Sequence, residues 1–104
     1  MPQEFTVIKK NILIVDDHPF IIQGYKNAIT RYRPTEYEFL IDQAKDCQSG
    51  YEVIVNPESP SFDIAFLDIS MPAYVEKGIL SGEDLAIVLM ERMPKCKIVL
   101  LTMF

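Results

Sequence analysis

Three short runs of apolar residues in this chain each end at a polar residue. Residues 12–15 (ILIV) precede Asp16 and Asp17, residues 64–67 (IAFL) precede Asp68, and residues 98–101 (IVLL) precede Thr102. A short apolar run without polar alternation is typical of a strand buried on both faces, as in a parallel sheet covered by helices. The pattern therefore predicts three central strands that each end in a residue able to bind a metal ion or a phosphoryl group.

The other patterns predict helices between strands. A first helix at 19–32 would bury one face, because apolar residues recur there at helical spacing (Ile21, Tyr25, Ala28, Ile29 and Tyr32). Ser81 and Asp84 fit a capping box that opens a third helix reaching Met93. The full set is strands at 11–15, 36–43, 63–67 and 97–101, and helices at 19–32, 47–55 and 81–93.

This alternation of strands and helices implies right-handed crossovers and a parallel sheet with helices on both faces. The predicted fold class is therefore α/β, a doubly wound three-layer sandwich with four strands and three helices. The 104 residues are enough for a single domain, 1–104, with one hydrophobic core.

Composition narrows the class of function. The net charge of −5 argues against direct contact with nucleic acid, because the chain has no basic stripe. No apolar run approaches the length of a membrane span, so a cytoplasmic location without membrane contact is the default expectation. Cys47 and Cys96 lie far apart without a histidine at metal-ligand spacing, and no chemistry is assigned to them.

Ligands of open parallel sheets bind beyond the carboxyl ends of the strands. If the strands at 11–15 and 63–67 are neighbours, Asp16, Asp17 and Asp68 meet there, and three negative charges at short range require a cation. Mg²⁺ fits best, because it prefers oxygen ligands and is held by carboxylates together with phosphate oxygens. A strand-end aspartate that only caps a helix is the alternative for any one of them.

Within such a site Asp68 is the candidate nucleophile. An ionised aspartate can form an aspartyl phosphate while a metal offsets the repulsion between the carboxylate and the phosphoryl oxygens. Asp68 stands alone at its strand end, whereas Asp16 and Asp17 are placed as a metal-holding pair. Thr102 could hydrogen-bond a phosphoryl oxygen, or alternatively only its own backbone.

Four motifs in order along the chain resemble the receiver domain of a two-component response regulator. They are residues 12–19 (ILIVDDHP), 66–72 (FLDISMP), 82–86 (GEDLA) and 97–102 (KIVLLT). The resemblance implies a flavodoxin-like sheet of order 2-1-3-4-5, with Asp68 as phospho-acceptor and Thr102 as switch hydroxyl. It also implies that Mg²⁺ is held by Asp16, Asp17, Asp68 and the backbone carbonyl of Ser70.

The resemblance further implies partners. The phosphoryl donor would be a phosphohistidine of a sensor histidine kinase, and phosphorylation would switch a downstream output, with transcription regulation expected. The string Asp16-Asp17-His18-Pro19 is similar to regulators that carry a LuxR-like helix-turn-helix output domain. DNA would then be contacted only through that domain. His18 itself is interpreted as a structural residue at the helix entrance.

The sequence departs from the family pattern at two places. The pattern continues beyond Thr102 to a lysine and an aromatic residue, whereas this chain ends at Phe104. We therefore expect a receiver lacking its last β-α unit, whose fourth strand is an exposed apolar edge that self-associates. Residues 73–81 also lengthen the loop beside the phosphorylation pocket. A tolerated surface insertion is the favoured explanation, and altered access to the pocket is the alternative.

Two other classes of function compete with the receiver. An aspartyl-nucleophile phosphatase of the haloacid dehalogenase group has a second aspartate two residues after its nucleophile. Ser70 holds that position here, which argues against turnover, so the chain is not expected to be an enzyme. The other alternative is an interaction or dimerisation domain that retains the receiver fold without being phosphorylated.

Overall fold

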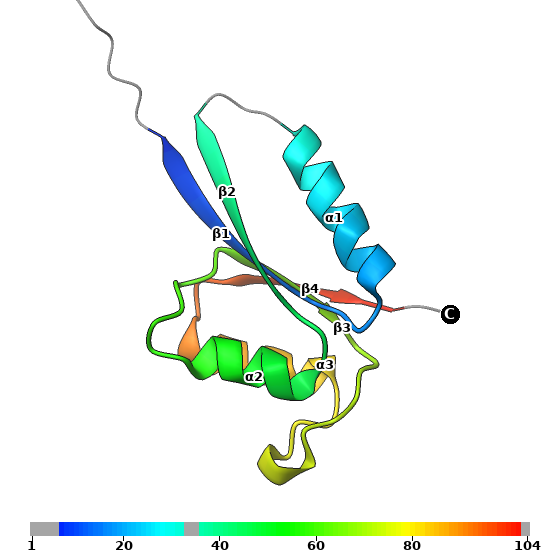
Figure 1. Ribbon diagram of the computed structural model, residues 1–104. Coiled ribbons are helices and arrows are strands. Elements are labelled where there is room, and N and C mark those ends of the chain that lie inside the picture. The colour runs from blue at the N-terminus through cyan, green and yellow to red at the C-terminus, as the bar shows by residue number, and fades with distance from the viewer. Residues whose placement is uncertain (1–6, 33–35, 103–104) are drawn as a thin grey trace, which may run out of the picture.

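The computed structural model describes residues 7–32 and 36–102, which form four strands and three α-helices (Figure 1). The strands are β1 (Ile8–Val15), β2 (Tyr37–Ala44), β3 (Ile64–Asp68) and β4 (Lys97–Leu101), and the helices are α1 (Pro19–Arg31), α2 (Cys47–Val55) and α3 (Gly82–Arg92). A short 3-10 helix, η1 (Val75–Lys77), lies in the loop between β3 and α3. The predicted order of elements is confirmed.

The strands form one parallel sheet in the order β2-β1-β3-β4. This order agrees with the expected doubly wound fold and with the first four positions of the order that the family resemblance implied. Strand β1 lies between β2 and β3 and is longer than predicted, because residues 8–10 also pair with β2. The sheet therefore places the carboxyl ends of β1 and β3 side by side.

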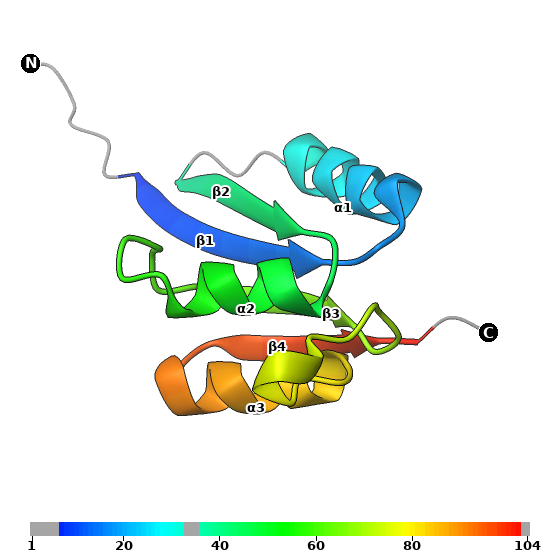
Figure 2. The ribbon, with the colours of Figure 1, turned by 60° about the horizontal axis from the view of Figure 1, so that its bottom comes forward.

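Helices cover both faces of the sheet (Figures 1 and 2). Helix α1 lies on one face, where Ile12, Ile14 and Ile22 form a small buried cluster. Helices α2 and α3 lie on the other face, over a larger cluster that includes Leu13 and Val15. Successive β1 residues thus point to opposite faces, and both faces are apolar because both are covered.

The buried face of α1 differs from the predicted one. Only Ile22 is buried in this helix, and Tyr25 and Ile29 pack beside it against the sheet. Ala28 and Tyr32 are exposed, and Tyr32 is the C-cap rather than a helical residue. The side chains that pack against the sheet, at 22, 25 and 29, lie on one narrow stripe of the helix. The predicted set covered a wider arc, because it also included residues 21, 28 and 32 beside this stripe.

The start of α2 has a capping box that the sequence analysis missed. The Asp46 side chain accepts a hydrogen bond from Ser49 N at 2.7 Å, and Ser49 Oγ accepts one from Asp46 N at 3.3 Å. At α3 the predicted N-cap is present, since Ser81 Oγ accepts from Asp84 N. In a full capping box the Asp84 carboxylate would accept a hydrogen bond from Ser81 N. Here it accepts one from Leu80 N instead, one residue earlier.

The long loop after β3 packs against α2. An isolated bridge pairs Tyr74 with Ile79, and Gly78 between them adopts a left-handed conformation with φ of 70°. The Tyr74 and Tyr51 rings pack edge to face, with their centroids 5.8 Å apart. Cys47 N donates a hydrogen bond to Pro72 O at 3.1 Å. The additional residues thus form an ordered turn fixed to α2.

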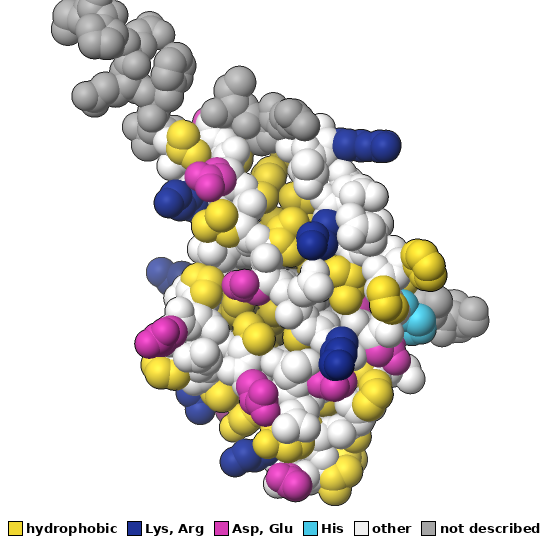
Figure 3. Space-filling model, viewed as in Figure 1, with side chains coloured by type: hydrophobic (Ala, Val, Ile, Leu, Met, Phe, Trp, Pro, Cys, Tyr) yellow, Lys and Arg dark blue, Asp and Glu magenta, His cyan; other side chains and the backbone are white. Residues whose placement is uncertain are grey.

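Charged side chains of both signs are interspersed on the face viewed in Figure 3, with no continuous basic area. Within residues 7–32 and 36–102, no helix combines the length and the apolar character needed to cross a membrane.

Candidate functional site

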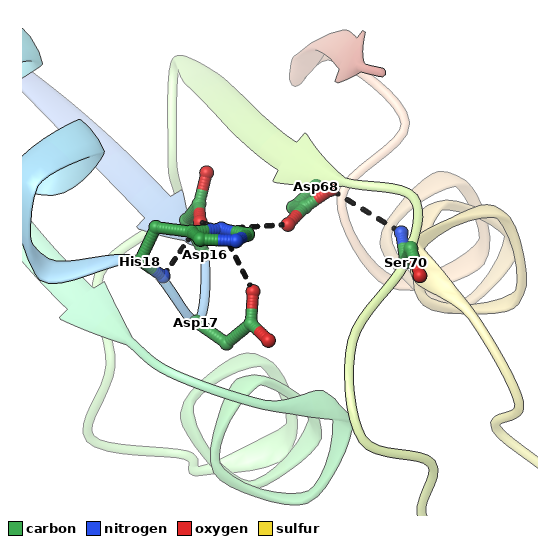
Figure 4. A network of polar contacts seen from close by, with 5 residues as sticks. All are labelled: Asp16, Asp17, His18, Asp68 and Ser70. Carbon is green, nitrogen blue, oxygen red and sulfur yellow. Dashed lines mark hydrogen bonds and ion pairs between the residues drawn. The ribbon is translucent and has the colours of Figure 1, made fainter. Parts of the chain in front are cut away.

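The carboxylates of Asp16, Asp17 and Asp68 meet at the carboxyl edge of the sheet. Asp16 follows directly after β1, Asp68 is the last residue of β3, and Val15 pairs with Leu67 between these two strands. Together with His18, each of these residues offers one ligand atom, and the four atoms all lie within 4.8 Å of one another (Figure 4). The geometry is what the sheet order requires of residues at adjacent strand ends.

Two of the three carboxylates are almost completely buried. Asp16 is 1% exposed and Asp68 is 2% exposed, whereas Asp17 lies at the surface. Asp68 Oδ1 accepts a hydrogen bond from Ser70 N at 3.2 Å, but Asp68 Oδ2 is buried without any hydrogen-bond partner. A buried carboxylate oxygen without a partner is costly, so this atom marks a position where a ligand would be stabilised.

The His18 ring lies among the three carboxylates (Figure 4). Its Nδ1 is 2.7 Å from Asp16 Oδ1, 3.0 Å from Asp17 Oδ1 and 3.5 Å from Asp68 Oδ2. His18 is the N-cap residue of α1, but its side chain makes no capping hydrogen bond. The sequence interpretation assigned this residue only to the helix entrance, whereas the structure places its side chain within the acidic cluster.

A close backbone contact with the start of α3 holds the end of β3, where Asp68 lies. Gly82, the first residue of α3, donates from its N–H to Ile69 O at 2.9 Å. A Cβ at this position would lie 2.0 Å from Asp68 O and 3.0 Å from Ile69 Cα. Only glycine allows the start of α3 to approach the end of β3 so closely, and this approach fixes the backbone that carries the Asp68 carboxylate.

The two remaining candidates lie at the same edge. Ser70 follows β3 by two residues, is exposed, and contributes its N–H to Asp68. Thr102 is exposed and follows directly after β4, where Asp68 pairs with Leu101 and Ile69 N donates to Leu101 O. Thr102 is thus one residue beyond the β4 partner of Asp68, whereas Lys97 lies at the opposite end of β4.

The family model of the response regulator receiver domain matches residues 12–104. The chain belongs to this family. The match includes all of the site residues, and the sequence resemblance is confirmed at the level of the family. A search of curated proteins gave no significant match.

Solved structures of response regulators have the same fold as this receiver domain. RcsB from Salmonella enterica serovar Typhimurium, bound to promoter rprA in the presence of the phosphomimetic BeF3⁻, is 20% identical with a TM-score of 0.67. The alignment covers 92% of this chain and 43% of that one. A LuxR-family response regulator from an Aurantimonas species is 26% identical with a TM-score of 0.66, over 93% of this chain and 61% of that one. The receiver domain thus spans about half the length of these relatives.

The electrostatics of the site shift the pKa of two groups. The hydrogen bond to Asp16 raises the pKa of His18 above its usual value, burial opposes this shift, and the charges of the three carboxylates add to it. Burial raises the pKa of Asp68, the Ser70 N–H opposes this shift, and the nearby charges of Asp16 and Asp17 add to it. The negative charges of the cluster contribute to both shifts, but the leading cause is a hydrogen bond for His18 and burial for Asp68.

The residues present fit a divalent cation. Three carboxylates supply hard oxygen ligands, and the partnerless Asp68 Oδ2 faces the cluster. A hollow of about 340 Å³ borders Asp16 and Asp17 and is also lined by Lys26 and Lys45. The hollow lies between α1 and β2 and borders the Asp16–Asp17 side of the cluster.

Proposed function

We propose that this receiver domain is the phospho-accepting module of a two-component response regulator. Asp68 accepts a phosphoryl group from a phosphohistidine of a sensor histidine kinase. Mg²⁺ is held by Asp16, Asp17, Asp68 and the backbone carbonyl of Ser70. Family membership and the arrangement of the acidic cluster support this assignment.

The observation that most supports the proposal is the hydrogen bonding of the Asp68 carboxylate. Its Oδ1 is held by the Ser70 N–H, which orients the group, while its Oδ2 is buried and has no hydrogen-bond partner. An oriented oxygen without a partner is available to bond a ligand at no cost in existing hydrogen bonds. A carboxylate that served only as a helix cap would instead have both its orientation and its bonding satisfied by backbone N–H groups.

In the proposed phosphoryl transfer, one bond to phosphorus forms and another breaks. An oxygen of ionised Asp68 forms a bond to phosphorus while the bond between phosphorus and the histidine nitrogen of the donor breaks, and the imidazole leaves with the electron pair. When bound, the divalent cation neutralises charge between the carboxylates and the phosphoryl oxygens. Asp16 and Asp17 would hold that cation, and the close β3–α3 contact at Gly82 keeps Asp68 in place.

The response to phosphorylation would run through Thr102 and an output domain. Thr102 lies one residue beyond the β4 partner of Asp68, so its hydroxyl can turn toward a phosphoryl group on that residue. Among the relatives, RcsB is described as bound to a promoter. By this likeness, we propose that the output is transcription regulation through a separate DNA-binding domain, and that the receiver domain itself makes no contact with DNA.

The domain would act as a phospho-acceptor and not as a turnover enzyme. Steady hydrolysis of a phosphate ester needs a general acid beside the nucleophile, and the residue two positions after Asp68 is Ser70. Ser70 offers its backbone N–H to Asp68 and has no ionisable side chain. This chemistry favours a stable aspartyl phosphate over the phosphatase alternative.

The test is the formation of a phosphoryl adduct. The chain is incubated with acetyl phosphate and Mg²⁺ and analysed by intact mass spectrometry, with Asp68→Asn and Asp42→Asn as matched charge-removing variants. Asp42 is exposed on β2 and is not a member of the acidic cluster. Wild type and Asp42→Asn should gain the mass of one phosphoryl group, and Asp68→Asn should not.

Two results would contradict the proposal. The absence of an adduct on folded wild-type protein would favour a pure interaction domain. Continuous release of phosphate from a small ester, abolished by Asp68→Asn, would favour the enzyme.

A further inference from the structure

The chain has one histidine, and its ring is the only side chain other than a carboxylate among the four residues of the cluster in Figure 4 that could hold a metal. Its Nδ1, and not its Nε2, faces the three carboxylates. The ring is held on the same short segment as Asp16 and Asp17, at the entrance to α1. A helix-capping role does not explain this arrangement, because the His18 side chain makes no capping hydrogen bond.

The four ligand atoms lie within 4.8 Å of one another, which brings all of them within reach of a single metal ion. Neighbouring ligands of an octahedral ion with bonds of about 2.1 Å lie about 3 Å apart. The distances from His18 Nδ1 to the three carboxylate oxygens are 2.7, 3.0 and 3.5 Å. The shortest of these contacts is the hydrogen bond between the ring and Asp16, so an ion bound by the ring would replace the proton shared between Nδ1 and that oxygen.

A second, independent feature indicates that this cluster takes a ligand. Asp68 Oδ2 is the one buried side-chain polar atom of the described residues that lacks a hydrogen-bond partner, in a residue that is 2% exposed. It is also the Asp68 atom nearest His18 Nδ1, but the separation of 3.5 Å is too long for a hydrogen bond of normal strength. The ring thus leaves this oxygen unsatisfied, and a bound cation would satisfy it.

We infer that His18 is a direct side-chain ligand of the metal site, and that the site consequently favours a divalent transition-metal ion over Mg²⁺ by more than its carboxylates alone would. The inference rests on the metal site of the proposed function. Imidazole nitrogen binds Co²⁺, Ni²⁺ and Zn²⁺ well, whereas Mg²⁺ prefers oxygen and water. The His18 side chain is 46% exposed, so an incoming ion can reach it.

The opposing view is that His18 serves only as a counter-cation for the carboxylates. In that case an incoming metal ion would displace the ring, and removing the ring would help every divalent ion equally. Direct ligation makes the opposite prediction. Loss of the ring would weaken binding of ions that accept nitrogen and would leave Mg²⁺ nearly unaffected.

The test compares Co²⁺ and Mg²⁺ binding by titration calorimetry at one fixed pH, on a tag-free chain. His18→Asn should weaken Co²⁺ binding by about tenfold or more, the scale on which metal sites respond to lost support. The same substitution should change Mg²⁺ affinity by less than about threefold, because Mg²⁺ prefers oxygen ligands. Asp42→Asn, which removes an exposed carboxylate on β2, should change neither affinity.

Proton NMR of the Co²⁺-loaded chain supplies a direct readout. A ligated ring should give a strongly shifted, solvent-exchangeable imidazole N–H signal, and this signal can only come from His18 because no other histidine exists in the chain. The signal should be absent from His18→Asn.

Three results overturn the inference. They are Co²⁺ binding without the shifted signal, an equal change in both affinities on His18→Asn, and failure of Co²⁺ to bind at all. None of these is the outcome that would contradict the proposed function, which concerns the phosphoryl adduct on Asp68. The two hypotheses can therefore fail separately.

Discussion

At the scale of single residues, the site depends on backbone positions as much as on its acidic side chains. Gly50 and Gly82 both stand where another element approaches closely. A Cβ on Gly50 would lie 2.8 Å from the end of the flexible Leu85 side chain, whereas one on Gly82 would meet the Asp68 backbone. A side-chain tip can move and a strand end cannot, so Gly82 is the stricter requirement.

We expect Gly82→Ala to lower the free energy of unfolding by about 1–3 kcal/mol, the usual cost of forcing extra atoms into a packed site. The reason is the separation of 2.0 Å between the added Cβ and Asp68 O, which requires α3 or the end of β3 to shift. Urea denaturation followed by circular dichroism measures the change. Because the shift would displace Asp68, the rate of adduct formation should fall as well.

Gly24→Ala is the matched control for this substitution. Gly24 is exposed within α1, and a Cβ there would meet nothing within 4 Å. Alanine should therefore raise the free energy of unfolding by about 0.5–1 kcal/mol through its higher helix propensity. Equal effects of the two substitutions would show that the contact at Gly82 is unimportant.

Some residue-level features could be predicted from the sequence and others could not. Asp16, Asp17 and Asp68 could be predicted to meet because each follows a strand, and strand ends have a fixed place in a parallel sheet. The position of the His18 ring could not. It depends on a side-chain torsion at the entrance of α1, where the ring can face solvent, the helix or the carboxylates, and the sequence does not distinguish these rotamers.

At the scale of elements, the helix termini show how local chemistry can be hidden in a sequence. The capping box of α2 pairs Asp46 with Ser49, whereas the usual capping box has glutamate or glutamine at the third helical position. Helix α2 also contains Gly50, which lowers intrinsic helix propensity. In the structure this glycine allows α2 to pack closely on Val15 and Leu85. The helix is thus maintained by its cap and its packing.

The cap of α2 leads to a prediction about pH. Hydrogen bonds from the Ser49 side chain and backbone lower the pKa of Asp46 below its ordinary value of 3.8. A lowered pKa in the folded state means that ionised Asp46 stabilises the fold above pH 3.8, and that this contribution is lost as the pH falls through the folded-state value. Asp46→Asn keeps a capping oxygen but removes the charge.

Wild type should therefore be more stable than Asp46→Asn by about 0.5 kcal/mol near neutral pH, the scale for a charge at a helix N-terminus. The difference should shrink toward zero at acid pH. Urea denaturation of both proteins at a series of pH values measures it, with Asp42→Asn as a control on a strand. A difference that grows as the pH falls would contradict the assignment.

Helix α1 shows the limit of reading a helix face from spacing alone. Its sequence has apolar residues at 20, 21, 22, 25, 28 and 29, which surround much of the helix. Several stripes therefore fit the helical period, and the contact with the sheet decides between them. Phe20 is 91% exposed while Ile22 is buried, although the two residues are equally apolar in the sequence pattern.

At the scale of the whole molecule, the fold followed from the sequence because its strands are unambiguous. Each central run is short, apolar on both faces and bounded by polar or turn residues. Alternation with helices then left one family of topologies, since parallel crossovers are right-handed. The order of strands came from the family resemblance, because no feature within a strand records which neighbour it will have.

The two edges of the described sheet differ in a way that predicts association. Strand β2 forms one edge and carries Glu38 and Asp42, whereas β4 forms the other and has Lys97 as its only charge. Leu100 on β4 is 43% exposed. An apolar edge with unpaired backbone groups is a template for pairing with another chain, and charges on an edge strand prevent this.

The 104-residue chain should therefore self-associate through β4, so that the mass measured by light scattering rises with protein concentration. Leu100→Lys should hold the mass at that of a monomer, because a charge on the edge opposes pairing of two copies. Leu40→Lys is the matched control, since Leu40 is 40% exposed on the opposite edge strand, and this variant should associate as wild type does. A wild-type mass that stays monomeric at high concentration, or equal disruption by both substitutions, would show that β4 is not the associating edge.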